Sequence, residues 1–367
     1  MAIDRRTLIA SLGSAAALSL LGGRAQAASP TVFAGARMDA AGKASLALFD
    51  STGAEIFATE LPGRGHDMAR SPDGQMLVVF ARRPGNWAIV VDRNGTVRHT
   101  ILSAPGRHFF GHGVFTPDGR LLHATENDFD GGRGMVGVYD ATDGFRRVGE
   151  FPSNGIGPHD VARMPGRDLI AVANGGIQTH PSTGRDILNK ESMAPNLSLV
   201  DGGGAVRASF DLGPRLHLSS IRHIAVAADG AIAFGCQFEG DPDDAPSLVG
   251  LVSPDGAVRL FDTPEDDLAA LANYVGAVAF DCEDRVIAAA CPRGGRVAFW
   301  DRDGRYLGSR RHPDGCGIAA APPEAGLFVI TSGNAGVRLV TPSKADLARL
   351  GGTALDRWVW DNHLRVV

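Results

Sequence analysis

The sequence predicts an all-β protein, a seven-bladed β-propeller that is closed by pairing N-terminal strands with a C-terminal inner strand. Three observations support this fold class. Short apolar segments separated by turns such as Pro72-Asp73-Gly74 recur along the chain, as in strands joined by hairpins. The recurring unit spans about 45 residues and contains four such segments, which is typical of a propeller blade. Glycine accounts for 48 of 367 residues, which suits many tight turns.

The first residues are interpreted as a signal peptide and not as part of the fold. Arg5-Arg6 opens a twin-arginine motif, a modestly apolar stretch follows over 9–21, and Ala25-Gln26-Ala27 has the form of a cleavage site. We therefore predict a signal peptide at 1–27, a propeller at 28–367 and export to the periplasm by the twin-arginine pathway. A general secretory signal or a short membrane anchor is the alternative, but the stretch is short for a bilayer. We expect no membrane span after the signal is removed.

Seven inner strands can be placed from the repeats. The last one lies at the C-terminus without outer strands of its own, and N-terminal segments at 31–37, 44–50 and 55–61 can supply them. Such pairing would tie both ends of the propeller into one blade and leave no open sheet edge. One short helix is expected around 343–350. The inner strands are expected to begin near His66, His112, His159, His223, Val275, Cys316 and His363.

Histidine begins five of these seven inner strands. Because inner strands line the central channel, we expect the imidazoles to converge at its mouth, where they would suit divalent iron, copper or zinc. We predict a transition-metal site, with iron as the first candidate and copper as the second. In the alternative without metal, each histidine hydrogen-bonds to a neighbouring blade in a polar channel. The predicted ligands are His66, His112, His159, His223 and His363, with the Cys316 thiolate as a sixth.

A second set of polar residues is expected on the same face. The second strand of each blade runs antiparallel to the first, so it ends where the first begins. An insertion at 175–195 follows one of these ends and would cover the channel mouth. The predicted cofactor-binding residues are Asn174 and Gln237 at strand ends and His180 and Arg185 in the insertion.

Glu126 is the candidate catalytic residue, as a general base or a ligand, because it also ends a second strand. A structural ion pair with Arg222 or Arg133 is the alternative. Asp67 and Asp160 directly follow inner-strand histidines. Adjacent side chains on a strand point to opposite faces, so each aspartate is expected to anchor its own blade.

Composition and motifs exclude several function classes. The formal net charge is -5, whereas nucleic-acid binding calls for a basic surface. The sequence has no Gly-x-Ser-x-Gly elbow, nucleotide-binding loop, His-Glu-x-x-His or Cys-x-x-Cys-His. The four cysteines form no Cys-x-x-Cys pair, and we expect mostly free, buried thiols.

The insertion resembles the central signature of an uncharacterised bacterial family of twin-arginine-exported proteins, a domain of unknown function. The resemblance rests on its Gly175-Gly176-Ile177-Gln178-Thr179-His180-Pro181 and Met193-Ala194-Pro195-Asn196-Leu197 segments and on the Gly65-His66-Asp67 turn. Genes of that family typically neighbour those of imelysin-like iron-regulated proteins and di-haem oxidoreductases. The resemblance implies a role in periplasmic iron uptake and these two classes of protein as partners, without an assigned reaction.

The resulting hypothesis is a periplasmic propeller that binds a transition metal at a histidine-lined channel mouth and acts in metal acquisition. Two alternatives stay open. One is a metal-dependent enzyme, either an oxidoreductase or a hydrolase or lactonase that uses Glu126. The histidine ring resembles the copper cluster of nitrous oxide reductase, although this chain has fewer histidines. The other is a metal-free scaffold for protein interactions.

Overall fold

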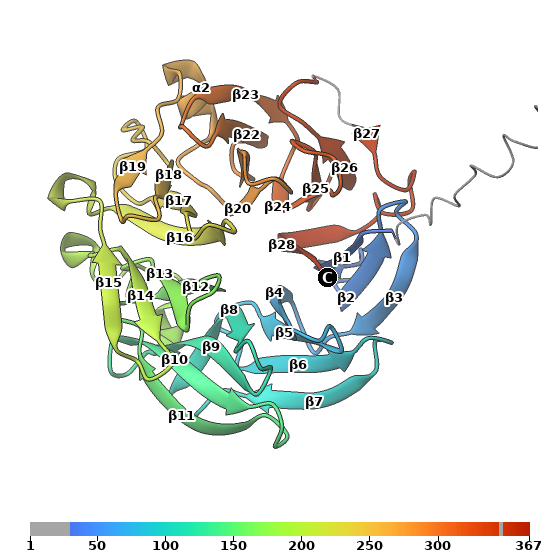
Figure 1. The fold of residues 1–367 in the computed structure, drawn as a ribbon, viewed down its shortest axis with the longest axis vertical. Coiled ribbons are helices and arrows are strands. Elements are labelled where there is room, and N and C mark those ends of the chain that lie inside the picture. Colours follow the sequence, from blue (N-terminus) through green and yellow to red (C-terminus); the bar gives the residue numbers. More distant parts are fainter. Residues whose placement is uncertain (1–29, 345–347) are drawn as a thin grey trace, which may run out of the picture. The chain divides into compact units, whose positions relative to one another are not determined.

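Seven four-stranded antiparallel sheets surround a central axis in this computed structural model, which describes residues 30–344 and 348–367 (Figure 1). The predicted seven-bladed β-propeller is therefore confirmed. The inner strands of neighbouring blades contact one another around the whole ring. The predicted signal peptide, 1–27, lies outside the described residues.

Each blade is numbered by its order along the chain and written from the inner strand outward. Blade 1 contains β28 (Val359–Val366), β1 (Val32–Met38), β2 (Ala44–Asp50) and β3 (Glu55–Glu60). Blade 2 contains β4 (Gly65–Arg70), β5 (Met76–Ala81), β6 (Trp87–Asp92) and β7 (Val97–Leu102). Blade 3 contains β8 (Arg107–Phe115), β9 (Leu121–Asp128), β10 (Arg133–Asp140) and β11 (Arg146–Pro152). Blade 4 contains β12 (Pro158–Arg163), β13 (Leu169–Asn174), β14 (Asn196–Asp201) and β15 (Val206–Phe210).

The remaining blades follow the same order. Blade 5 contains β16 (Ser219–Val226), β17 (Ile232–Phe238), β18 (Val249–Val252) and β19 (Val258–Leu260). Blade 6 contains β20 (Ala277–Phe280), β21 (Val286–Cys291), β22 (Arg296–Asp301) and β23 (Tyr306–Arg311). Blade 7 contains β24 (Gly315–Ala320), β25 (Phe328–Ser332), β26 (Val337–Val340) and β27 (Ala348–Arg349).

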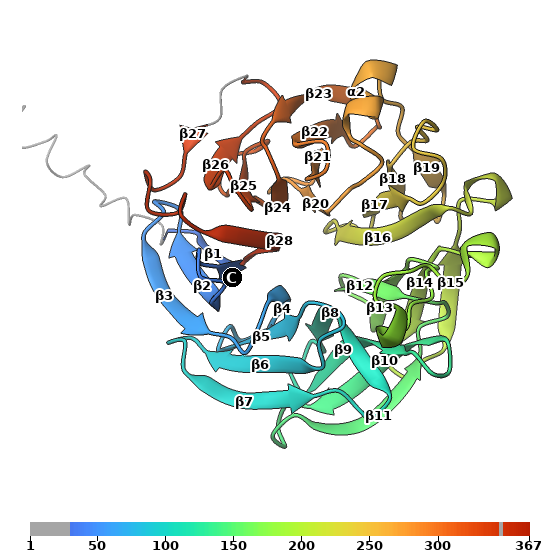
Figure 2. The ribbon, with the colours of Figure 1, turned by 180° about the vertical axis from the view of Figure 1, so that it is seen from behind.

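Blade 1 closes the ring in the predicted way. The C-terminal strand β28 pairs antiparallel with β1, with Gly35 opposite Leu364 and Arg37 opposite Trp360. Both views of the ribbon show β28 between β1 and the channel, with the C-terminus beside it (Figures 1 and 2). The Trp360 indole packs edge-on against Phe49 with ring centroids 5.3 Å apart. Both ends of the propeller are therefore held in one sheet.

The core lies between adjacent blades, and the strand sequences reflect their depth. Middle strands are covered on both faces, so β5 reads Met76-Leu77-Val78-Val79-Phe80-Ala81 with almost every residue buried. The outer strand β7 faces solvent and buries only Ile101. Blades 2 and 3 share a cluster in which Phe80 packs edge-on against Phe109, with ring centroids 5.6 Å apart.

One secondary-structure prediction is wrong. A helix was expected around 343–350, but Ala348–Arg349 form the edge strand β27 on β26, and residues 345–347 lie outside the described residues. The α-helix that the structure describes is α2 (Glu265–Ala270), and the 3-10 turns are η1 (Pro181–Thr183), η2 (Lys190–Ser192) and η3 (Pro214–Leu216). None of the described helices is long and apolar enough to cross a membrane.

The expectation for the cysteines is confirmed. All four thiols are free, and only Cys282 is exposed.

Candidate metal centre

The five inner-strand histidines converge in the channel. They come from β4, β8, β12, β16 and β28, and each is at most 6% exposed. Ring centroids lie 4.6 Å apart for His66 and His363, 4.6 Å for His112 and His363, and 4.7 Å for His159 and His223. We call these five residues, His66, His112, His159, His223 and His363, the histidine cluster.

β-Bulges direct these side chains into the channel. The register of β4 on β5 shifts between Gly65 and Met68, so β4 has one extra residue there and His66 and Asp67 together lie opposite one residue of β5. Similar shifts flank His112 on β8, His159 on β12 and Arg222 on β16. In a regular strand, adjacent side chains point to opposite faces of the sheet, whereas a bulge changes the direction of the side chains at the extra residue. Histidine and the residue beside it can therefore both point inward.

Aspartates on the same strands bind the histidine rings, and their predicted role was wrong. Asp67 accepts a 2.8 Å hydrogen bond from Nδ1 of His112 in the next blade, and Asp160 lies 3.1 Å from the same nitrogen. Asp361 accepts from Nδ1 of His66 at 3.0 Å. Asp67 and Asp160 therefore join neighbouring blades and do not simply anchor their own. A carboxylate on Nδ1 orients the imidazole so that Nε2 is available to a metal, as in many metal sites.

Burial keeps most of the cluster in the neutral form that binds metals. It lowers the pKa of His66 to about 4 and those of His159, His223 and His363 well below the usual value. His112 differs because burial opposes its charge but Asp160 and Asp67 raise its pKa to about 9. His112 therefore favours the protonated form, and a metal bound to His112 would displace one of its ring protons.

Several ring nitrogens of the cluster have no hydrogen-bond partner among the described residues. A buried polar atom without a partner costs about 1–3 kcal/mol, so each one requires a physical explanation. The unpaired atoms are Nε2 of His112, Nδ1 of His159, both nitrogens of His223 and Nε2 of His363. A bound cation would be coordinated by one nitrogen from each ring, since a neutral imidazole has one lone pair to offer.

Three groups of side chains are close enough to share an ion. Within each group, the potential ligand atoms all lie within 4.8 Å of one another. Metal–imidazole bonds of about 2.0–2.1 Å allow opposite ligands to lie about 4.2 Å apart, so small side-chain movements would suffice. The groups are His66–His112–His363, His112–His159–His223 and Asp67–His112–Asp160. The histidine cluster and its aspartates could therefore hold a metal ion.

Cys316, the predicted sixth ligand, occupies the equivalent place on β24 but is not part of these groups. Its buried sulfur faces backbone carbonyls, 3.2 Å from Asp361 O and 3.5 Å from Trp360 O. Burial raises the pKa of this thiol to about 12, which disfavours the thiolate.

Glu126 is not brought to the channel mouth. Its carboxylate is fully buried within blade 3, where it accepts hydrogen bonds from Tyr139 Oη at 2.6 Å and Arg147 Nη2 at 2.9 Å. Arg107 lies 3.6 Å away. An ion pair was one of the two predicted roles, but the predicted partners were wrong: Arg133 pairs with Asp128 instead.

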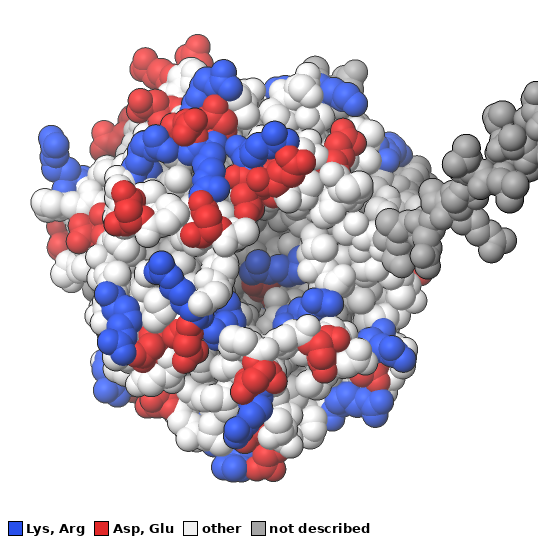
Figure 3. Space-filling view, in the orientation of Figure 1, with Lys and Arg blue, Asp and Glu red and all other residues white. Residues whose placement is uncertain are grey.

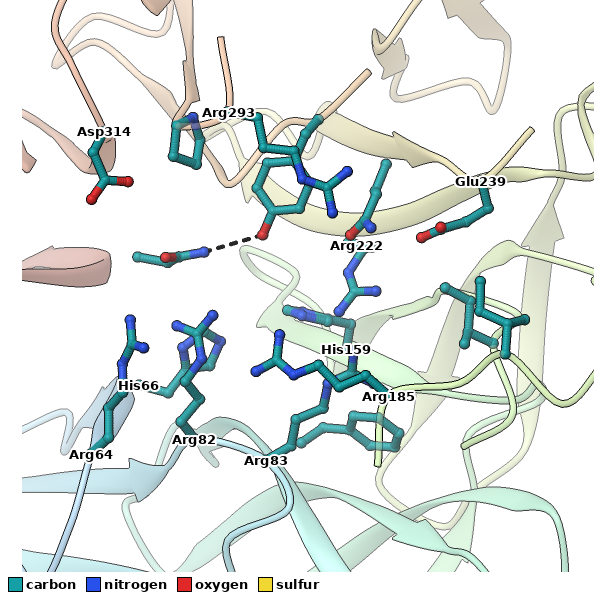
Figure 4. Close-up of a pocket in the computed structure, with 17 residues that line it drawn as sticks. Arg64, His66, Arg82, Arg83, His159, Arg185, Arg222, Glu239, Arg293 and Asp314 are labelled. Carbon is teal, nitrogen blue, oxygen red and sulfur yellow. Dashed lines mark hydrogen bonds between the residues drawn. The ribbon is translucent and has the colours of Figure 1, made fainter. Parts of the chain in front are cut away.

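A pocket of about 460 Å³ opens above the cluster, and His66 and His159 belong to its lining (Figure 4). The space-filling view, in the orientation of Figure 1, shows a hollow at the centre of the ring with basic side chains around and inside it (Figure 3). Of the four predicted cofactor-binding residues, Gln237 and Arg185 line the pocket. The structure does not bring the other two there. Asn174 donates to Ser153 O at 2.8 Å, and His180 lies 3.4 Å from Asp130.

Sequence reasoning missed most of the charged residues of this pocket. Arg64, Arg82 and Arg83 flank the β4–β5 hairpin on the side where His66 lies, and Glu239 follows β17 next to Gln237. These residues lie at the same strand ends as the predicted site residues, and this shared position is the signal in the sequence that could have identified them. The side chains of all six pocket arginines are drawn in Figure 4: Arg64, Arg82, Arg83, Arg185, Arg222 and Arg293.

The fold and the cluster together define a class of protein, a seven-bladed propeller with a potential metal site in its channel. Within that class, the chain belongs to the family described as "Protein of unknown function (DUF1513)", whose profile matches residues 59–367. This membership agrees with the predicted domain of unknown function, whereas twin-arginine export and the gene neighbourhood stay predictions. No curated protein matches the sequence.

Three solved structures illustrate the similarity of fold. Hydrazine synthase of Kuenenia stuttgartiensis has a TM-score of 0.60 and 17% identity, over 82% of this chain and 90% of that one. The Cps50 (Swd1) β-propeller domain of Myceliophteria thermophila has a TM-score of 0.59 and 12% identity, over 84% and 96%. U3-55K has a TM-score of 0.56 and 14% identity, over 78% and 82%. At such identities the likeness concerns the fold alone.

Proposed function

We propose that this protein binds a transition-metal ion, with iron as the first candidate, at the histidine cluster and acts in metal acquisition in the periplasm. The observation that carries the proposal is the set of unpaired buried nitrogens on His112, His159, His223 and His363. Imidazole with carboxylates behind it suits iron, copper and zinc, and the metal analysis below distinguishes them.

The burial of the cluster supports a binding role. Each proposed ligand is at most 6% exposed, so a bound ion would be shielded from solvent, which suits retention of a captured ion. Export by the twin-arginine pathway and a partnership with imelysin-like proteins or di-haem oxidoreductases are parts of the same proposal. They rest on the sequence motif and the family resemblance.

The test is the metal content of the mature protein, purified from the periplasm without an affinity tag and analysed by mass spectrometry. A His223→Gln/His363→Gln variant removes two ligands that make no hydrogen bond to an aspartate. His123→Gln is the matched control, since His123 is equally buried but packs against Phe151 outside the cluster.

About one metal ion per chain is expected in the wild type and the control, and none in the double variant with its thermal unfolding intact. The dominant element identifies the ion. If none of the three proteins retains metal, even after anaerobic incubation with ferrous iron, the proposal is wrong.

A further inference from the structure

The arginines of the pocket are its most unusual feature. Six guanidinium groups line it, against the carboxylates of Glu239 and Asp314. Asp361, just behind the lining, neutralises part of this charge by pairing with Arg82 at 2.8 Å and with Arg64. The pocket therefore has an excess of positive charge on a protein whose formal net charge is -5.

Four of these arginines have no carboxylate within ion-pair distance among the described residues: Arg83, Arg185, Arg222 and Arg293. Arg222 is 94% buried, and its Nε has no hydrogen-bond partner among the residues that the structure describes. Arg293 stacks on Tyr274 with its guanidinium carbon 4.5 Å from the ring centroid. The guanidinium groups of Arg83, Arg185 and Arg222 point into the same space from three different blades (Figure 4).

The crowding of like charges is unfavourable without an anion. Burial, together with Arg222 and Arg185, lowers the pKa of Arg83 to about 9. Buried charges in proteins are normally paired, because removing a charge from water is costly. Guanidinium groups bind carboxylates and phosphates through two parallel hydrogen bonds. Convergent arginines without partners therefore indicate an anionic ligand.

The other lining residues indicate that this anion is organic. Phe110, Ile177, Ile187 and Tyr274 give the pocket apolar walls, which a bare inorganic ion would leave without contacts. Its volume of about 460 Å³ lies in the range of small-molecule sites. Gln237 and Glu239 supply acceptors suited to ligand hydroxyl groups.

We propose that this pocket binds a small organic polycarboxylate, and that the metal ion reaches the histidine cluster as its polycarboxylate complex. The second part rests on the proposed function, whereas the first does not. His66 and His159 line the pocket and belong to the cluster, so a carboxylate held by the arginines lies next to two of the proposed ligands.

Calorimetric titration of the metal-free mature protein with citrate tests the anion site alone. One citrate per chain is expected, with affinity about tenfold weaker in Arg83→Gln and in Arg185→Gln, since a charge-assisted hydrogen bond is lost in each. Arg185 lies on the insertion loop, so its replacement leaves the blades intact. Arg98→Gln is the control, because Arg98 is on the exposed strand β7 and pairs with Asp92.

Inorganic phosphate is titrated in parallel. Phosphate that binds as tightly as citrate overturns the organic class of ligand, and no citrate binding overturns the anion site. The metal route is tested separately by anaerobic loading with ferrous iron in the presence and absence of citrate. The Arg185→Gln variant should load at least tenfold more slowly than wild type from the ferrous citrate complex, but equally from ferrous ion without citrate; equal loading from both overturns the route. Citrate binding without any retained metal leaves the anion site intact and contradicts only the proposed function.

Discussion

Glu126 provides a sharp test of the difference between a catalytic and a structural carboxylate. The Glu126→Gln substitution removes one charge and changes the shape of the side chain little. The carboxylate is fully buried and holds Arg147 at 2.9 Å and the Tyr139 hydroxyl at 2.6 Å. We expect this variant to be destabilised and to bind metal and citrate like the wild type.

The expected loss of stability can be estimated from the groups that interact with the Glu126 carboxylate. Breaking a buried ion pair on one side costs about 3–5 kcal/mol. Arg107 and Arg147 both keep Glu150, at 2.7 and 2.6 Å, and the new amide oxygen can still accept from Tyr139. The low end, about 3 kcal/mol, is therefore expected. For a domain of this size that is a fall in Tm of about 4–6 °C.

The assay is thermal and urea unfolding of both proteins, with Glu150→Gln as the matched control. Glu150 binds the same two arginines but its side chain is 32% exposed, so its loss should cost about 1 kcal/mol or less. Unchanged stability of Glu126→Gln with loss of metal or citrate binding would refute the reasoning and assign Glu126 to the site.

Three further predictions concern stability. Arg365→Gln leaves buried Asp67 with only His112 beside it and should destabilise the protein by about 3 kcal/mol in urea unfolding; no change would show that His112 suffices. Trp360→Ala should cost about 3–5 kcal/mol and expose β28 to limited proteolysis; unaltered resistance would mean that β28 does not close the ring. Burial lowers the pKa of His123 to about 4, so its unfolded form takes up a proton first as pH falls below about 6.5, and stability decreases between there and pH 4. His123→Gln should remove about 2–3 kcal/mol of the loss between pH 7 and 4.5, while exposed His99→Gln should not; equal losses in both would contradict the assignment.

The sequence predicted the position of the site better than its electrostatics. The five histidines recur at one place in successive repeats, and repetition in a closed ring brings equivalent positions together. Glu126 lies near the end of the second strand of its blade, as Gln237 does in another blade. The Glu126 side chain nevertheless turns into the blade, where it accepts a hydrogen bond from Arg147. Which face a side chain takes at a strand end depends on local register, which the repeat alone does not specify.

The sequence by itself determined the number of blades, the closure by the C-terminal strand and the histidine cluster. Each follows from local patterns: turn residues, apolar runs and a fixed repeat. Only the tertiary structure decided the roles of Asp67 and Asp160, because bulges override the alternation of side chains. The same holds for the arginine-lined pocket, since Arg83, Arg185 and Arg222 lie far apart in the chain and meet only when the ring closes.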